Sequence, residues 1–466
     1  MSPREFLQVY DQNDKRIIRG TYYPSDPLPV EEGDKVGVVM MNLGGPDTLD
    51  DVEPFLYNLF MDPAIIDLNL PLVGDAEVSL NWLFNKPFNG ALRDKLCQFI
   101  ASKRSEFVRE DYDMIGGGSP INSLTREQAR GLEQVLNDQY AESTGASFHT
   151  YIAMRYWHPF SEEAAEQMEE DGIDKVVLLP LYPQYSKTTT GSSLVWWKAL
   201  EDAGEIPAWP TTTVFEYAAN PKYIQALSER IDQGLQRFPS DIRSDVHVLF
   251  SAHGTPLKEL TDRRDPYCCL VHSTVEQVMR YRQFDRPYHS AFQSKVGPVK
   301  WLAPSTPDKL EELAEEGHKD VLVVPVAFVT DHIETSFELD IEVREEAEEF
   351  GIEHYEVTSG LNSHPLFIEA LMEATVAQLD LTRDAKRPAH SGDGVPSDEA
   401  YPLQPLDQLP RYASEKRDTR CPQCQCVTEA RCWTGDPDAE AERPEPLKDL
   451  YADARTCGQS DLATQS

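Results

Sequence analysis

A histidine and a row of acidic residues after an apolar segment could carry metal and proton chemistry. Residues 321–328 are apolar and predict a buried strand, and Asp331-His332-Ile333-Glu334 follows, where the pattern turns helical. On an α-helix Glu334, Glu338 and Glu342 would share one face, because they are four residues apart. Carboxylate oxygens suit hard divalent cations, so the spacing predicts a path for a divalent metal. The alternative is a solvated acidic helix face with Asp331 as its N-cap.

Three further side chains that could act on a ligand lie just after predicted strands. Arg155 follows a strand at 149–154, Tyr182 follows one at 175–181, and His253 follows one at 246–250. Ligands of open α/β sheets bind beyond the carboxyl ends of the strands, so these side chains and Glu334 are predicted to gather at one crevice. Taken alone, a histidine such as His253 is more often a structural residue.

The elements that must position these residues alternate between strands and helices, which predicts an α/β fold of two Rossmann-like halves, each a doubly wound parallel sheet. We predict five segments. They are a flexible N-terminal arm at 1–34, a first half at 35–190, a second half with His253 and Glu334 at 191–382, a linker at 383–420 rich in Pro, Asp, Gly and Ser, and a Cys-rich tail at 421–466.

Two glycine-rich stretches follow predicted elements in the first half. Asn42-Leu43-Gly44-Gly45-Pro46 lacks the Gly-x-Gly-x-x-Gly spacing, and Pro46 removes a backbone N–H donor, so a dinucleotide site is rejected. The loop Gly116-Gly-Gly-Ser-Pro120 permits a tight bend and the close approach of a flat ligand. By itself this second stretch is a weak signal.

Charge and hydropathy exclude several classes of protein. The 466 residues carry a formal charge of −37, which argues against nucleic acid or anionic lipid as partners. Residues 384–466 hold 16 acidic and 10 basic side chains, so most of the charge belongs to the body, as in adaptation to high salt. No apolar run reaches the ~20 residues of a membrane span, and the N-terminus lacks a signal-peptide core, so we expect a cytoplasmic location.

Two local concentrations of residues need an explanation. Large apolar side chains gather at Trp82, Leu83, Phe84 and Phe88, either as an ordinary helical layer or as an exposed apolar lip at a pocket mouth. Four of the eight cysteines, Cys421, Cys424, Cys426 and Cys432, fall within twelve residues. With no secretion signal, a disulfide scaffold is not expected.

The motifs together resemble the ferrochelatase family over about residues 35–380. The matching segments, in family order, are Leu43-Gly-Gly-Pro-Asp-Thr48, Gly116-Gly-Gly-Ser-Pro120, Arg155-Tyr156 with His158-Pro159, Tyr182-Pro-Gln-Tyr-Ser186, Thr189-Thr-Gly-Ser-Ser193, Phe250-Ser-Ala-His253, Arg264-Asp-Pro-Tyr267, Gln293-Ser-Lys-Val-Gly-Pro298 with Trp301-Leu302, and Asp331-His-Ile-Glu-Thr335 with Glu338-Leu-Asp-Ile341. The later segments are highly specific to the family.

The resemblance implies insertion of Fe²⁺ into a porphyrin in haem synthesis, within a central cleft between the two halves. It implies that His253 abstracts a pyrrole proton or ligates iron with Glu334 as partner, and that Glu338 and Glu342 continue the metal path. It further implies a macrocycle pocket and a pair of cations for the propionates, formed by Leu43, Tyr112, Ser119, Arg155, Tyr156, Tyr182 and Trp301, with Lys103 and Arg104.

Two features depart from the family pattern. Residues 70–95 are longer than in relatives, which affects the predicted lip. In cluster-bearing relatives one cluster cysteine follows the Tyr182-Pro-Gln-Tyr-Ser186 motif, where this chain has Lys187. The tail keeps Cys421-Pro-Gln-Cys424 and adds Cys426 and Cys432, so it supplies four thiolates for a [2Fe–2S] cluster; Zn²⁺ on the same cysteines is the alternative.

The function that follows is a ferrochelatase that acts on protoporphyrin IX, with coproporphyrin III as the alternative porphyrin. A chelatase for another tetrapyrrole and an inactive tetrapyrrole or iron–sulfur sensor on the same fold are the other hypotheses, and the intact His253 and Glu334 argue against a sensor. Transient contact of the lip with the inner membrane or with a partner of the haem pathway is also expected.

Overall fold

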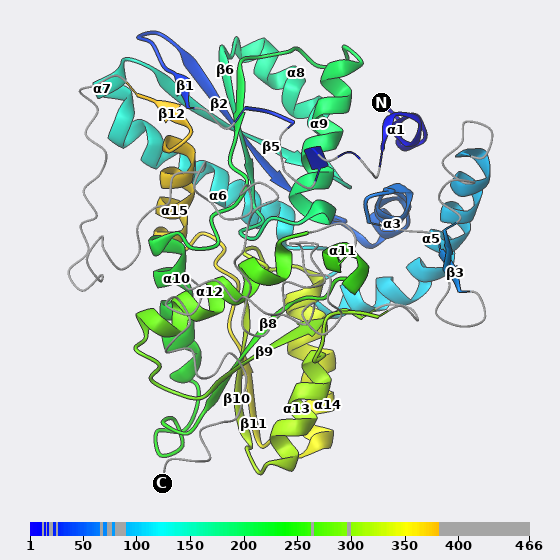
Figure 1. The fold of residues 1–466 in the computed structure, drawn as a ribbon, viewed down its shortest axis with the longest axis vertical. Coiled ribbons are helices and arrows are strands. Elements are labelled where there is room, and N and C mark those ends of the chain that lie inside the picture. Colours follow the sequence, from blue (N-terminus) through cyan, green and yellow to red (C-terminus); the bar gives the residue numbers. More distant parts are fainter. Residues whose placement is uncertain are drawn as a thin grey trace, which may run out of the picture. The chain divides into compact units, whose positions relative to one another are not determined.

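The computed structural model describes residues 1–381 except 12–13, 15, 18–21, 25–26, 66–68, 72–76, 80–89, 262–264 and 296–299. The chain divides into two compact units. Of the described residues, the first contains Met1–Leu181, Ser186–Phe215 and 378–381, and the second contains Tyr182–Tyr185 and Glu216–Ala377. Both units are built on parallel sheets with helices (Figure 1). This confirms the predicted α/β class.

The first unit is built on a four-stranded sheet in the order β5-β2-β6-β7, from β2 (Lys35–Asn42), β5 (Ser147–Met154), β6 (Lys175–Pro180) and β7 (Thr211–Thr213). All three pairings are parallel, and Met41 of the central strand β2 lies opposite Ala153 and Pro180. From Val36 to Asn42 every residue of β2 is buried, which is the continuous apolar pattern of a strand covered on both faces.

The N-terminal segment, predicted as a flexible arm, is packed in its described part. Helix α1 (Pro3–Val9) begins with a capping box between Ser2 and Glu5, which satisfies its first N–H groups. Its Phe6 is buried, with its ring centroid 5.0 Å from that of Trp196. Strand β1 (Leu28–Pro29) pairs in parallel with β12 (Leu379–Asp380) from the end of the fold. Apolar burial and strand pairing explain the difference from a loose arm.

The helices of the first unit connect its strands, and a short antiparallel pair, β3 (Asn69–Pro71) with β4 (Glu77–Ser79), lies outside the main sheet. The unit extends to Phe215, past the predicted boundary at 190, because β7 pairs with β6. Its helices are α3 (Val52–Met61), α5 (Gly90–Met114), α6 (Ile121–Leu136), α7 (Glu142–Thr144), α8 (Ser161–Asp171) and α9 (Ser192–Asp202), with a 3₁₀ turn η1 (Leu49–Asp51) and π-helical turns η2 (Asn137–Ala141) and η3 (Lys187–Gly191).

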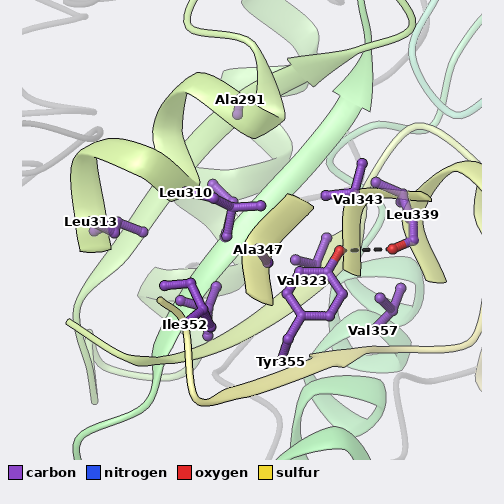
Figure 2. Packing of buried hydrophobic residues seen from close by; sticks show 12 residues of the cluster. Ala291, Leu310, Leu313, Val323, Leu339, Val343, Ala347, Ile352, Tyr355 and Val357 are labelled. Carbon is purple, nitrogen blue, oxygen red and sulfur yellow. Dashed lines mark hydrogen bonds between the residues drawn. The ribbon is translucent and has the colours of Figure 1, made fainter. Parts of the chain in front are cut away.

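The second unit contains a four-stranded parallel sheet in the order β11-β10-β8-β9. Its strands are β8 (His247–His253), β9 (Tyr288–Gln293), β10 (Asp320–Pro325) and β11 (His354–Val357). On one face Val321 and Val323 pack with Leu310 and Leu313 of a covering helix, as Figure 2 shows for part of this core. Strand β11 was not predicted, because its four residues alternate between half-buried and buried positions and leave too short a pattern.

The helices of the second unit lie between and after its strands along the chain. They are α10 (Pro221–Leu235), α11 (Leu257–Thr261), α12 (Tyr267–Tyr281), α13 (Thr306–Glu315), α14 (Val343–Phe350) and α15 (Pro365–Val376). A nine-residue π-helix, η4 (Glu334–Glu342), precedes α14. Within the described part of the chain, no helix has the length and apolar character needed to cross a membrane.

Candidate active site

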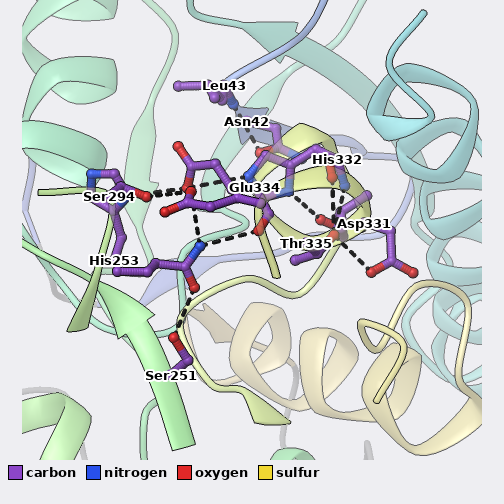
Figure 3. Close-up of polar contacts among 12 residues, drawn as sticks. Asn42, Leu43, Ser251, His253, Ser294, Asp331, His332, Glu334 and Thr335 are labelled. Carbon is purple, nitrogen blue, oxygen red and sulfur yellow. Dashed lines mark hydrogen bonds and ion pairs between the residues drawn. The ribbon is translucent and has the colours of Figure 1, made fainter. Parts of the chain in front are cut away.

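The carboxyl end of the second sheet brings together the histidine and the glutamate that the sequence singled out. His253 is the last residue of β8, and Glu334 is the first residue of η4. His253 Nδ1 lies 3.0 Å from Glu334 Oε2 (Figure 3). A carboxylate only accepts hydrogen bonds, so the geometry assigns the proton to Nδ1 and leaves the Nε2 lone pair for a base or metal ligand. The His253 side chain is 40% exposed and therefore open to a ligand.

The pKa shifts of His253 and Glu334 favour a negative charge on Glu334 and a positive charge on His253. Burial alone lowers the pKa of His253, but the carboxylates of Glu334 and Glu338 outweigh it and raise that pKa above its usual value. Burial raises the pKa of Glu334, yet the neighbouring His253 and His332 reverse the effect and hold it far below the usual range. Glu334 is therefore an anion at neutral pH, and it stabilises a proton taken up by His253.

Glu338 lies one turn farther along η4 and is held by two residues that end or follow β9. Its Oε2 accepts hydrogen bonds from Ser294 Oγ at 2.6 Å and from Gln293 Nε2 at 3.2 Å. Gln293 Nε2 also donates to the backbone oxygen of Glu334, and its Oε1 accepts from Ser251 Oγ at 2.9 Å. Burial and the nearby Glu334 raise the pKa of Glu338, so it takes up a proton more readily than Glu334 does.

The acidic row lies on a π-helix and not on the predicted α-helix. A π-helix closes i→i+5 hydrogen bonds, so residues four apart fall just short of one turn and still lie on one side. Along the row, Glu334 and Glu338 are half-buried and Glu342 is exposed. The row of glutamates therefore runs from the His253–Glu334 pair to the surface. Among the described residues, no group of three or more His, Cys, Asp or Glu side chains is arranged to hold a metal ion.

A second histidine supports Glu334 from the other side. The His332 side chain is 6% exposed, and its Nε2 lies 3.7 Å from Glu334 Oε2. Its Nδ1 lies 2.9 Å from the backbone oxygen of Thr330, which can only accept, so Nδ1 carries the proton. The ring of Phe328 lies edge-on to both imidazoles, with centroids 4.6 Å from His332 and 6.0 Å from His253. These contacts restrict the two imidazole rings.

In the first unit, the loop after β2 packs against the loop that contains Ser119. Ser119 donates its backbone N–H to the oxygen of Pro46 at 2.7 Å. A Cβ on Gly118 would lie 2.2 Å from the backbone oxygen of Asp47, so only glycine fits this approach. Leu43, which precedes Gly44, and Ser119 are both half-buried. The two glycine-rich stretches noted in the sequence thus form one structure.

Arg155 and Tyr156 are buried and have their partners inside the first unit. Arg155 Nη2 is 2.9 Å from Asp62 Oδ2, which also accepts from Tyr156 Oη at 2.6 Å and from Ser192 Oγ at 2.5 Å. The Arg155 guanidinium lies over the ring of Trp196, 4.4 Å from its centroid. Arg155, the cation that was predicted to line the crevice, is therefore already paired with Asp62. That Arg155 lies near His253 stays a prediction, because the two residues belong to different units.

Comparison with known proteins decides the family. The model of the family described as ferrochelatase matches residues 35–77 and 83–379. The chain belongs to the ferrochelatase family. It is 43% identical over 347 residues to a ferrochelatase of Trichodesmium erythraeum (74% of this chain, 83% of the relative) and 44% identical over 350 residues to one of Synechococcus elongatus (75% and 84%). It is 40% identical over 403 residues to one of Rippkaea orientalis (86% and 93%).

Ferrochelatases are metal-inserting enzymes that act on a porphyrin in haem synthesis, so this chain is a metal-inserting enzyme. The remaining predicted substrate residues are placed as follows. Tyr112 is buried in α5; Lys103 and Arg104 are exposed on the same helix; Tyr182 and Trp301 are half-buried members of the second unit. The four tail cysteines and the predicted lip at 82–88 lie outside the described residues.

Sequence reasoning missed three residues that organise the ferrochelatase framework. Gln293 and Ser294 belong to a segment that resembled the family, but no role was assigned to them and no strand was predicted before them; the family motif itself was the usable signal. Asp62 had no signal, because its partners Arg155 and Ser192 are distant in sequence.

Proposed function

We propose that this chain inserts Fe²⁺ into protoporphyrin IX at His253 and Glu334, with release of two protons. The supporting observation is the hydrogen bond of 3.0 Å in which His253 Nδ1–H donates to Glu334, which leaves Nε2 as the basic atom. A half-buried imidazole paired with a half-buried carboxylate is suited to accept a proton from a pyrrole nitrogen as the metal enters.

Proton balance follows from the same residues. The porphyrin loses two pyrrole N–H protons, and the iron keeps its +2 charge, so no electrons are exchanged. His253 accepts a proton at Nε2, and the anionic Glu334 stabilises the resulting imidazolium. Glu338, whose pKa is raised by burial and by Glu334, is the carboxylate best suited to hold a proton beside it.

The acidic row supports a delivery path for the substrate iron. Fe²⁺, a borderline cation that accepts both oxygen and imidazole ligands, enters from the exposed Glu342 toward the half-buried Glu338 and Glu334, where His253 supplies a nitrogen ligand. The porphyrin is proposed to contact Leu43, Ser119, Tyr112, Tyr182 and Trp301, with Arg155 and Tyr156 shaping the wall and not pairing with ligand charge. Lys103, with a side chain 63% exposed, and Arg104 are proposed to pair with the propionates.

Anaerobic insertion of Fe²⁺ into protoporphyrin IX and coproporphyrin III, measured side by side, tests the porphyrin. We expect a higher kcat/KM with protoporphyrin IX. A preference for coproporphyrin III would replace the substrate, and turnover only with another tetrapyrrole, such as sirohydrochlorin, would replace the proposed reaction. Binding of porphyrin with no turnover under any condition would support the sensor hypothesis.

For the tail we propose that Cys421, Cys424, Cys426 and Cys432 hold one [2Fe–2S] cluster. The support is the sequence alone, since four cysteines with short spacings supply the required thiolates and Lys187 stands where cluster-bearing relatives have a cysteine. Anaerobically purified protein should show visible charge-transfer absorption that is lost on Cys→Ser substitution at any of the four positions. A colourless protein with stoichiometric zinc would establish the zinc alternative.

We also propose a cytoplasmic location with transient contact to the inner membrane or a haem-pathway partner. Exposed apolar side chains on α5, at Leu92, Phe99, Phe107 and Met114, follow the predicted lip in sequence and support such a contact. Liposome flotation of the protein and of a variant with Trp82, Leu83, Phe84 and Phe88 changed to Ser tests it. Equal flotation of both would count against the lip.

A further inference from the structure

The loop between β11 and α15 holds the chain just before the catalytic glutamate through one asparagine. Asn362 Oδ1 accepts the backbone N–H of Asp331 at 3.0 Å, and Asn362 Nδ2 donates to Asp331 Oδ2 at 2.7 Å. Because a backbone N–H can only donate, this pair of contacts fixes the orientation of the amide. A single side chain thus binds both the backbone and the side chain of Asp331.

Asp331 passes this restraint to the start of η4. Its Oδ1 accepts from the backbone N–H of Gly360 at 2.8 Å and from Thr335 Oγ1 at 3.1 Å. Thr335 Oγ1 in turn accepts the backbone N–H of His332 at 3.0 Å. His332 and Thr335, which lie on either side of Glu334, are therefore linked to Asp331 by hydrogen bonds. The position of the Glu334 backbone thus depends on where Asp331 is held.

The loop that carries Asn362 is itself anchored in the second unit. The backbone N–H of Asn362 donates to the backbone oxygen of Val329 at 2.7 Å, and Arg230 Nη2 of α10 donates to the backbone oxygen of Leu361 at 3.0 Å. A Cβ at Gly360 would lie 2.9 Å from Asp331 Oδ1, so a side chain there would displace the Asp331 carboxylate. The anchor is therefore fixed independently of η4.

The backbone of Asn362 has an unusual conformation that serves this contact. Its φ is 48°, in the left-handed region, which is uncommon for residues other than glycine. Glycine would adopt this φ without strain, but it would lose both side-chain hydrogen bonds. Asparagine tolerates the conformation and keeps the amide, so backbone geometry alone does not account for this residue.

We propose that Asn362 is a positioning residue for metal insertion, acting through Asp331 to hold Glu334 against His253. The inference rests on the proposed roles of His253 and Glu334. A displacement of a catalytic group by about 1 Å can cost up to ~10²-fold in rate, so a partial loosening of this contact should lower kcat by roughly tenfold. The porphyrin KM should not change, because Asn362 acts on the metal and proton groups.

The test is a set of three variants that separates the amide from the backbone and from charge. Asn362→Gly keeps the left-handed backbone but removes both hydrogen bonds. Asn362→Asp replaces the donor and puts a second carboxylate beside Asp331. The double variant Asp331→Asn with Asn362→Asp exchanges the two groups. It can re-form the side-chain hydrogen bond with donor and acceptor reversed, while the backbone N–H groups of residues 331 and 360 still meet an oxygen acceptor. Ser359→Ala, at an exposed position in the same loop, is the matched control.

We expect Asn362→Gly and Asn362→Asp to lower kcat about tenfold with an unchanged porphyrin KM, and the double variant to restore most of kcat. Thermal unfolding of each variant verifies that the fold is intact at the assay temperature. Wild-type kcat in Asn362→Gly, or a double variant as slow as Asn362→Asp, would overturn the inference. Full activity of His253→Ala would instead contradict the proposed site, so the two failures are distinguishable.

Discussion

The two sheets end in clusters of charged side chains that are used in opposite ways. After β5 of the first unit, Arg155 and Asp62 are 7% and 0% exposed, and their polar atoms meet each other, Tyr156 and Ser192. After β8 of the second unit, His253 and Glu334 also pair, but their side chains are 40% and 24% exposed. The first cluster is closed to ligands, whereas the second keeps a nitrogen lone pair open.

In both units, reactive side chains follow the carboxyl ends of the strands. The exposure of their polar atoms distinguishes the structural cluster of the first unit from the reactive pair of the second. A buried ion pair with all its partners in place maintains the fold of its unit, because breaking it leaves an unpaired charge. A half-exposed pair with shifted pKa values is suited to proton transfer. The comparison therefore predicts different consequences for substitutions at the two ends.

The largest effect is expected for Asp62→Ala, which leaves Arg155 buried without its carboxylate. The free energy of unfolding should fall by about 3–5 kcal/mol, because the uncompensated charge stays in a buried environment. Denaturant unfolding measures it. The control is Asp340→Ala, which breaks an exposed pair with Arg344 and should cost less than about 1 kcal/mol. Equal losses in the two variants would remove the distinction drawn for the first unit.

Substitution at the open end should affect activity and spare stability. His253→Ala and Glu334→Gln should each lower kcat for metal insertion at least ~10²-fold, because each removes a group that we propose to act on the proton or the metal. Porphyrin binding, followed by absorbance or fluorescence, should persist. Glu345→Gln on the exposed side of α14 is the control. Near-normal turnover of either variant would show that the active site lies elsewhere.

The two ends of β8 allow a pH test of the same comparison. At its amino end burial and His318 lower the pKa of His247 to about 4, and burial, His247 and Lys309 lower that of His289 to about 3. Their Nδ1 and Nε2 atoms lie 3.0 Å apart, so at least one imidazole must be neutral. Both therefore stabilise the fold above pH 6.5, the usual histidine pKa, and this contribution is lost as the pH falls toward 4.

The expected loss is roughly 1 kcal/mol for each histidine between pH 6.5 and pH 5.5. The measurement is the free energy of unfolding against pH for the protein and for a variant with His247→Leu and His289→Leu. The variant should show the smaller loss on acidification. His149→Gln, in the sheet of the other unit, is the control. An identical pH slope in the double variant would contradict the role of the buried pair.

The smallest effect is expected at the outer end of the acidic row. Glu342→Gln should raise the KM for Fe²⁺ about two- to threefold and leave kcat unchanged, because an exposed charge contributes little to binding. Steady-state insertion at varied Fe²⁺ concentration checks this. A large fall in kcat would place Glu342 in the chemical step and shorten the proposed path.

Much of the fold and the central pair could be predicted from local patterns. The apolar runs of β2, β6 and β10 are continuous, so their burial on both faces was readable in the sequence. Strand β11 and the ordered N-terminal helix α1 were not predicted, since their stability comes from pairing and packing with distant segments. Asn362 and Asp62 were missed for the same reason.

By itself, the sequence determined the family, the α/β class and the position of His253 and Glu334 after strands, because motif order and hydrophobic periodicity are written along the chain. Only the tertiary structure decided that Arg155 is buried against Asp62, that the acidic row lies on a π-helix, and that Asn362 holds Asp331. Burial, helix type and hydrogen-bond partners depend on residues far apart in the chain, so no local pattern can specify them.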